Sequence, residues 1–314
     1  MDILQQAIRL DPLSLPSHLL LTNGLTLMRR FDEAEEATKR IREINAQSPY
    51  GLLSEGRINL LQGNWAAATQ LVEQATKLDP NDPEIAAFVG DLYLGLGLPS
   101  EAGQWYDRAA EIFPGHPVSL SRPLLLNWIV NGSDKDNVRQ ARKLLEDKIE
   151  NRWGSRSIPA YILLDSAQQT GDYTALLETL DNLHPQLFDD SPANIADDLE
   201  MTFFVGRALV QSGQTERGFR LLDAWSIDTV KLEAVIGLST ESIEIDLLRG
   251  DKQAALVKLQ ARDSMKYDDA FDRFYFARDS LWQTLADEPQ FIELVEHLNQ
   301  HAAEQRAILL SRTP

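Results

Sequence analysis

The chain has 314 residues, with 30 basic and 48 acidic side chains and a formal net charge of −18. Binding to nucleic acid needs Lys and Arg to neutralise phosphates, so this charge predicts no direct nucleic-acid partner. The chain has no cysteine, which excludes disulfides, thiolate metal sites and a cysteine nucleophile, and no run of 18 apolar residues, which predicts no membrane insertion. These observations leave both the cytoplasm and the periplasm open.

Small residues and a proline recur in the first third of the chain at a spacing of 34 residues. The members that recur are Gly56, Gly63, Ala68, Ala75 and Pro80, which return as Gly90, Gly97, Ala102, Ala109 and Pro114. A period of this length is typical of helical hairpins that bury their core by stacking on one another. The repeat therefore predicts an extended recognition surface rather than an enclosed active site.

In chain order, residues 1–12 are expected to form only the second helix of a hairpin, because Ala7 to Pro12 parallels Ala75 to Pro80. Complete hairpins are expected over 15–48, 49–82 and 83–114. In the last of these, Gly97 ends the first helix and Pro99 opens the second. Gly90 is expected to let the two helices approach closely, since side-chain size sets the distance between packed helices.

The period loosens after Pro114. Asn131 falls one period after Gly97 and is expected to end a helix in the left-handed conformation. Gly171 marks a turn between helices near 157–170 and 173–183, and 185–195 is a candidate linker. The last helix, opened by Pro289, is expected to cap the final hairpin. The expected organisation is 1–114 as regular repeats, 115–190 as divergent hairpins, and 191–314 as divergent repeats with a cap.

These residues resemble the tetratricopeptide repeat, a unit of 34 residues that forms a helix–turn–helix. The resemblance is clearest over 49–114 and extends through 1–48. It implies an all-α, right-handed α-α superhelix with a C-terminal capping helix. It also implies a non-catalytic scaffold whose concave face, lined by the first helices, binds a peptide or protein segment.

The tail from Leu281 to Phe291, with Gln305 and Arg306, resembles the closing segment of bacterial tetratricopeptide regions. Those regions follow a nucleotide-cyclase or a winged-helix DNA-binding domain. The resemblance implies the C-terminal part of a larger bacterial signalling protein. Two functions therefore stay open, a peptide-binding scaffold and a sensory region that controls an attached domain.

The period also indicates which side chains face the groove. Asn23, Arg57 and Asp91 share one slot of successive first helices, and later units offer Tyr161 and Asp165, then Phe203 and Arg207. Such a mixed groove suits a partly apolar peptide with at least one basic and one acidic group. The alternative is that these residues are ordinary solvated side chains. A carboxylate clamp of the kind known in the family is excluded, because only two of its residue types are present and Asp91 repels a carboxylate.

His297 and His301 lie four residues apart on the last predicted helix, a spacing at which two imidazoles can ligate zinc. A zinc hydrolase is therefore a remote third function, against the simpler interpretation of a polar helix face. No dinucleotide, phosphate-loop or nucleophile-elbow motif is present, so neither a cofactor nor an enzymatic activity is expected. Self-association is expected through residues 1–12 or the C-terminal helix.

Overall fold

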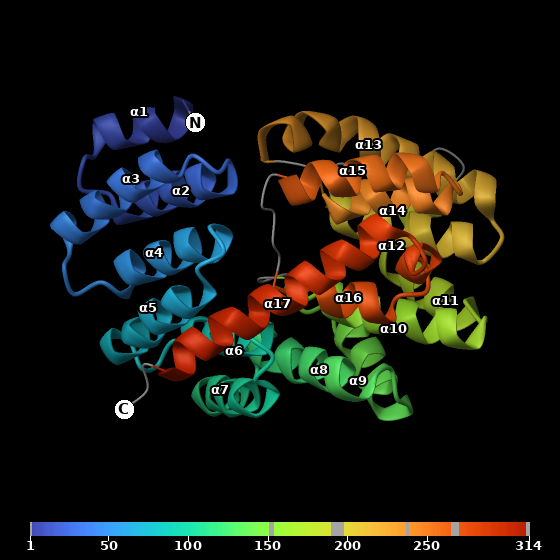
Figure 1. Ribbon diagram of the computed structural model, residues 1–314, viewed down its shortest axis with the longest axis horizontal. Coiled ribbons are helices and arrows are strands. Elements are labelled where there is room, and N and C mark those ends of the chain that lie inside the picture. The colour runs from blue at the N-terminus through green and yellow to red at the C-terminus, as the bar shows by residue number, and fades with distance from the viewer. Residues whose placement is uncertain (1, 151–153, 190–197, 237–238, 265–269, 312–314) are drawn as a thin grey trace. The chain divides into compact units, whose positions relative to one another are not determined.

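A computed structural model describes residues 2–150, 154–189, 198–236, 239–264 and 270–311. Over these ranges the chain forms seventeen α-helices and no strand, which confirms the all-α prediction (Figure 1). The helices are α1 (Asp2–Leu10), α2 (Leu15–Leu27), α3 (Phe31–Ile44), α4 (Pro49–Leu61), α5 (Trp65–Leu78), α6 (Pro83–Gly95), α7 (Pro99–Ile112), α8 (Pro117–Asn131), α9 (Lys135–Glu146), α10 (Ser157–Thr170), α11 (Thr174–Leu183), α12 (Leu199–Gln211), α13 (Thr215–Ile236), α14 (Thr240–Leu248), α15 (Lys252–Ser264), α16 (Asp272–Arg278) and α17 (Pro289–Ser311). Within the described ranges, none of these helices is both long and apolar enough to cross a bilayer.

The chain folds as two compact units. Unit 1 comprises Met1–Ile112, Asp263–Asp272 and Glu296–Pro314, and unit 2 comprises Phe113–Arg262 and Arg273–Val295. The first break lies two residues before the boundary expected at 114. The division of the remaining chain at 190 stays a prediction.

Unit 1 contains the regular hairpins, α2–α3, α4–α5 and α6–α7. Their first helices start in the same way, with a capping side chain followed by proline in the first turn. The Asp82 carboxylate, for example, accepts hydrogen bonds from the amides of Glu84 and Ile85 at 2.8 and 3.1 Å. These local signals set the hairpin boundaries at the expected period.

The predicted close approach of paired helices is confirmed at Gly56 and Gly90. A Cβ atom built on Gly56 lies 2.6 Å from Val72 Cγ2, and one built on Gly90 collides with the Tyr106 ring. The α4–α5 and α6–α7 hairpins thus each place a larger side chain of the second helix against a glycine of the first helix. Because no side chain separates the backbones there, the helices pack at close range.

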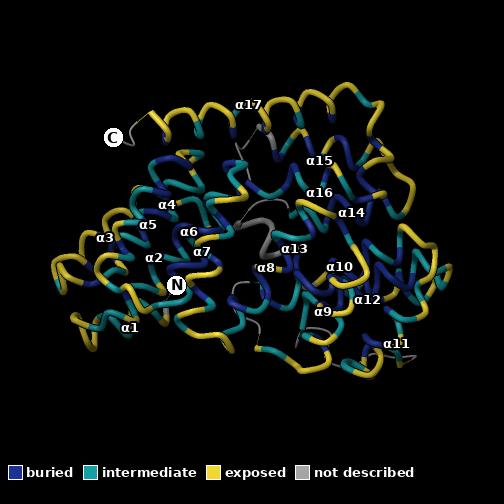
Figure 2. Tube along the Cα trace, turned by 90° about the horizontal axis from the view of Figure 1, so that it is seen from below, coloured by how far each residue is buried: buried dark blue, intermediate teal, exposed yellow. Residues whose placement is uncertain are grey.

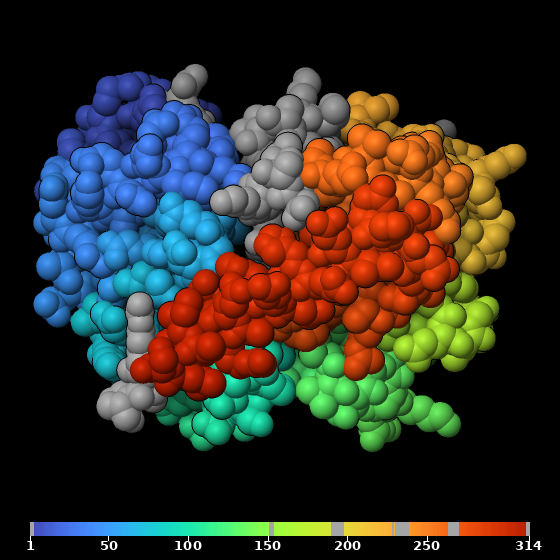
Figure 3. All heavy atoms as spheres, viewed as in Figure 1, coloured from blue at the N-terminus to red at the C-terminus, as the bar shows by residue number. Residues whose placement is uncertain are grey.

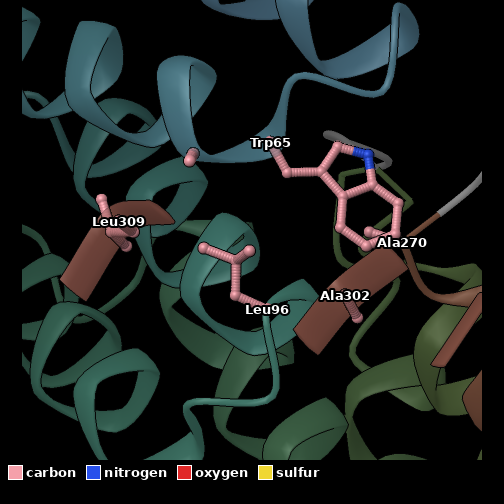
Figure 4. Close-up of a cluster of buried hydrophobic side chains, with 6 residues drawn as sticks. Trp65, Leu96, Ala270, Ala302 and Leu309 are labelled. Carbon is pink, nitrogen blue, oxygen red and sulfur yellow. The ribbon is translucent and has the colours of Figure 1, made fainter. Parts of the chain in front are cut away.

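The C-terminal part of α17 packs within unit 1, beside α5 and the end of α6 (Figure 3). Trp65 forms a buried cluster with Leu96, Ala270, Ala302 and Leu309 (Figure 4). The outward side of α17 is exposed (Figure 2). A cap on the final hairpin alone was expected, but only the first turns of α17, residues 289–295, belong to unit 2.

Unit 2 contains the helix pairs α8–α9, α10–α11, α12–α13 and α14–α15, which belong to the part of the chain where the sequence period loosens. The prediction that Asn131 takes the left-handed conformation is wrong. Asn131 is the last residue of α8, and Gly132 has a φ of 82° instead, because glycine adopts this region without steric cost.

Gly171 does end α10 with a φ of 70°, as predicted. The candidate linker begins with a short 3-10 helix, Pro185–Leu187, and its residues from 190 lie outside the described ranges.

Candidate functional site

Three of the predicted groove residues form a row on the first helices of unit 1. Asn23 lies on α2, Arg57 on α4 and Asp91 on α6, and all three are partly buried. Arg57 Nη1 donates a hydrogen bond to Asn23 Oδ1 at 3.0 Å, and its guanidinium lies 5.7 Å from the centre of the Phe88 ring. The 34-residue period thus brings an amide and a guanidinium from consecutive repeats into direct contact.

The charge of Arg57 is maintained in this setting. Burial lowers the pKa of Arg57 to about 10, while the Glu84 carboxylate acts in the opposite direction. A guanidinium with this pKa is protonated at neutral pH. It is therefore a cation held against an aromatic ring, a combination suited to binding an acidic or carbonyl group of a ligand.

Asp91 is held by the other helix of its own hairpin. The Tyr106 hydroxyl donates a hydrogen bond to Asp91 Oδ1 at 2.8 Å, and the Tyr106 ring packs against Gly90. The glycine that permits close packing therefore also positions the tyrosine that orients this carboxylate. The row presents an amide, a cation and an anion in fixed order.

The structure places the other predicted groove residues inside unit 2. The exposed fractions of Asp165, Phe203 and Arg207 are 2%, 4% and 0%. Asp165 accepts a hydrogen bond from Trp128 Nε1 at 2.8 Å, and Phe203 packs in a buried cluster with Trp225. These three side chains contact other parts of unit 2.

Arg207 and Tyr161 belong to one buried polar cluster. Arg207 Nη1 donates to Glu244 and Arg207 Nη2 to Asp279, the latter at 2.5 Å, and the Tyr161 hydroxyl donates to the same Asp279. Trp282 Nε1 donates to the remaining Glu244 oxygen, Oε1, at 2.9 Å. One guanidinium thus binds two carboxylates that lie 37 and 72 residues farther along the chain.

The pKa values of this cluster follow from burial and from its single cation. Burial raises the pKa of Tyr161, and the adjacent Asp279 carboxylate raises it further. Burial also raises the pKa of Glu244, to about 7, although Arg207 opposes the shift. Burial acts to raise the pKa of Asp279, but Arg207 together with the hydrogen bonds from the Tyr161 hydroxyl and the Leu281 amide outweighs it, so the pKa of Asp279 is lowered. Asp279 is therefore the firmly ionised partner of Arg207.

Sequence analysis missed Glu244, Asp279 and Trp282 as members of this cluster. One signal for Glu244 was present, because it lies directly between two isoleucines, Ile243 and Ile245. A charged residue in such a position needs a buried partner. Its partners are distant in sequence and do not follow the period, so the pattern did not identify them.

His301 has a structural role in unit 1. Its Nε2 atom lies 2.8 Å from the Gly63 carbonyl oxygen, and its ring contacts Trp65 edge-on with centroids 4.7 Å apart. Across the described parts of the chain, no three His, Cys, Asp or Glu side chains are grouped so that they could hold a metal ion. The imidazole that the zinc-hydrolase alternative requires is thus engaged with the turn that precedes α5.

Comparisons with known proteins agree with the repeat pattern. The family model of the tetratricopeptide repeat matches residues 28–83 and 53–117. No curated protein matches the chain.

Solved structures also resemble the chain. A tetratricopeptide repeat protein from Parabacteroides merdae is 16% identical with a TM-score of 0.48, over 92% of this chain and 98% of that one. The apo form of the quorum sensor NprR from B. thuringiensis is 14% identical with a TM-score of 0.50, over 90% and 86%. The APC/C hetero-tetramer Cut9–Hcn1 contains a chain that is 13% identical with a TM-score of 0.48; the match covers 95% of this chain and only 51% of that one. At these identities the likeness concerns the fold alone.

Proposed function

We propose that the chain is a non-catalytic scaffold that binds a segment of a protein partner along the first helices of unit 1, where the tetratricopeptide-repeat family model matches residues 28–83 and 53–117. The observation that carries the proposal is the row formed by Asn23, Arg57 and Asp91 on three consecutive repeats. These side chains are polar, oriented by neighbours and partly exposed. They can make several hydrogen bonds to an extended or helical peptide without reorganising.

The row also suggests what the peptide contains. Arg57 favours an acidic side chain or a carbonyl group, and Asp91 favours a basic one. One turn earlier on the same helices, Leu19 and Leu53 are partly buried and add apolar contact. A partly apolar segment with one acidic and one basic group therefore fits this surface best.

The test is a selection of random peptides on the immobilised full chain. The selected peptides are then measured by fluorescence polarisation on the wild type and on Arg57→Gln, Asn23→Ala and Arg40→Ala. Arg40 serves as the matched control, because it is an exposed arginine on α3 that pairs with Glu43 at 2.6 Å. Loss of a hydrogen bond to a charged group costs about 1.5–3 kcal/mol, so Arg57→Gln is expected to weaken binding by about tenfold or more.

Arg40→Ala is expected to bind like the wild type. If the selected peptides bind Arg57→Gln and Asn23→Ala as tightly as the wild type, the row is not the binding site. Circular dichroism of each variant verifies that the helices are intact, so a change in affinity is not a change in folding.

A further inference from the structure

The first helices of unit 2 are covered by a segment of the same chain, residues 273–285, which includes most of α16 and the 3-10 helix Trp282–Leu285. On α8, the Ile129 carbonyl oxygen accepts a hydrogen bond from Arg278 Nη2 at 2.7 Å. On α10, Tyr161 donates its hydroxyl to Asp279 and packs against the Tyr275 ring, with centroids 4.5 Å apart. The segment therefore contacts the first helices of two consecutive helix pairs, α8 and α10.

The next two helix pairs continue this contact. On α12, Arg207 binds the Asp279 carboxylate at 2.5 Å, and on α14, Glu244 accepts from Trp282 Nε1 at 2.9 Å. Four first helices thus bind one segment by their side chains or backbone. Helical repeat arrays use such surfaces of stacked helices for binding, and here the surface is contacted by a segment of the same chain.

The contact residues of the segment lie close together in the sequence. Tyr275 and Arg278 lie three residues apart on α16, Asp279 follows the last residue of that helix, and Trp282 opens the 3-10 helix three residues later. The anchors are a carboxylate and a tryptophan three residues later. Both are almost fully buried, with exposed fractions of 1% for Asp279 and 0% for Trp282.

Arg207 keeps a carboxylate partner when the segment leaves the groove. Arg207 is bound to Asp279 of the segment and also to Glu244 of α14. If the segment leaves, the Arg207–Glu244 pair remains, and the Tyr161 hydroxyl returns to water. Opening therefore does not leave an unpaired buried charge, which is the most costly outcome of breaking such contacts.

From these contacts we propose that the first-helix face of unit 2 is a second recognition groove, which binds a partner segment carrying a carboxylate and a tryptophan three residues later. Segment 273–285 occupies this groove in the chain itself and competes with the partner. Because the segment occupies this groove, its release regulates whether the partner binds. The groove belongs to unit 2, and the row of Asn23, Arg57 and Asp91 belongs to unit 1. The partner is identified by the same chemistry that holds the segment: an acid for Arg207 and an indole N–H for Glu244.

Hydrogen exchange with mass spectrometry on the wild-type full chain tests whether the segment opens. A displaceable segment detaches without unfolding of the unit, so amides of 273–285 are expected to exchange at least about tenfold faster than the slowest amides of α10 and α12. If the most protected amides of 273–285 exchange only with those of α10 and α12, the segment is part of the core and the proposal is overturned.

Binding in trans is measured with a fluorescent synthetic peptide of residues 272–287 and the full chain. Asp279→Asn in the chain weakens the internal contact and is expected to increase the affinity for the wild-type peptide at least about tenfold. The matched control Asp287→Asn changes an exposed aspartate near the segment and is expected to behave like the wild type. A peptide that carries Asn at the position of Asp279 is expected to bind at least about tenfold more weakly.

The proposal fails if Asp279→Asn binds the peptide no more tightly than the wild type, or if the Asn-containing peptide binds equally well. Arg57→Gln in the chain is expected to leave this binding unchanged. The test therefore succeeds or fails independently of the peptide site proposed in unit 1.

Discussion

At the residue scale, Gly90 connects the packing of unit 1 to its candidate site. A Cβ added at this position meets the Tyr106 ring and lies 3.2 Å from the Ala102 carbonyl oxygen. The ring is not free to move away, because its hydroxyl is bound to Asp91 at 2.8 Å. Gly90→Ala is therefore expected to destabilise the chain by about 1–3 kcal/mol through overpacking, measured by urea denaturation.

Gly115→Ala is the matched control for this prediction. The nearest atom to a Cβ on Gly115 is Phe113 Cε2 at 3.4 Å, at the edge of ordinary contact, and the residue is exposed. A change of less than about 0.5 kcal/mol is expected there. Equal effects at both glycines would show that close helix approach is not what Gly90 provides.

His301 gives a second prediction at this scale. His301→Ala removes the contact with the Gly63 carbonyl oxygen at 2.8 Å and the edge-on contact with Trp65. The expected loss of stability is about 1–3 kcal/mol, because a partly buried backbone acceptor loses its partner. Gln300→Ala, one residue earlier on the exposed side of α17, is expected to change the midpoint of denaturation little. If His301→Ala has the same midpoint of denaturation as the wild type, this contact does not stabilise α17.

At the element scale, α1 carries the clearest exposed apolar surface. Ile3 and Leu10 have exposed fractions of 81% and 82%, and they lie seven residues apart on one side of the helix. Exposed apolar groups of this kind favour association. The chain is therefore expected to self-associate at high concentration. Ile3→Lys with Leu10→Lys is expected to raise the dissociation constant at least about tenfold, measured by analytical ultracentrifugation.

Leu78→Lys is a suitable control, since Leu78 ends α5 and is itself 39% exposed. It is expected to leave the dissociation constant unchanged. A wild-type chain that sediments as a monomer at all concentrations would contradict the prediction for α1.

The sequence predicts the hairpins of unit 1 well because their determinants are local. Gly56 and Gly90 meet residues of the next helix only 16 positions away, and the period repeats that contact. The position of α17 was not predictable in the same way. Its contact through His301 joins residues 238 positions apart, and no repeat relates them.

The groove residues show the same limit. Asn23 and Arg57 were predicted to share a slot, and they contact each other because they are one period apart. Whether the row binds a partner stays a prediction. In unit 2 the equivalent pattern identified Tyr161 and Arg207, but it gave no information on the segment that covers them. That segment lies 72 residues beyond Arg207 at Asp279, outside the period.

At the scale of the whole molecule, the buried cluster of unit 2 predicts how stability depends on pH. Glu244 faces Arg207 of α12, Asp279 of segment 273–285, and Glu241 of its own helix. Burial raises its pKa to about 7 in the folded chain, above the ordinary value of 4.5. Between these two values the folded chain holds a proton that the unfolded chain has released.

Stability is therefore expected to be highest near pH 5 and to fall as the pH rises through 7, by at most about 1.4 kcal/mol per pH unit. Above that range the contribution of Glu244 is constant. The net charge of −18 gives a trend of the same sign, since repulsion among carboxylates also weakens at lower pH. The variant Glu244→Gln separates the titration of Glu244 from the effect of net charge, because glutamine mimics the protonated form and the other acidic residues stay unchanged. Urea denaturation from pH 5 to 8 is expected to show a steeper loss for the wild type than for Glu244→Gln. Parallel curves would assign the whole pH dependence to net charge and would remove Glu244 as its source.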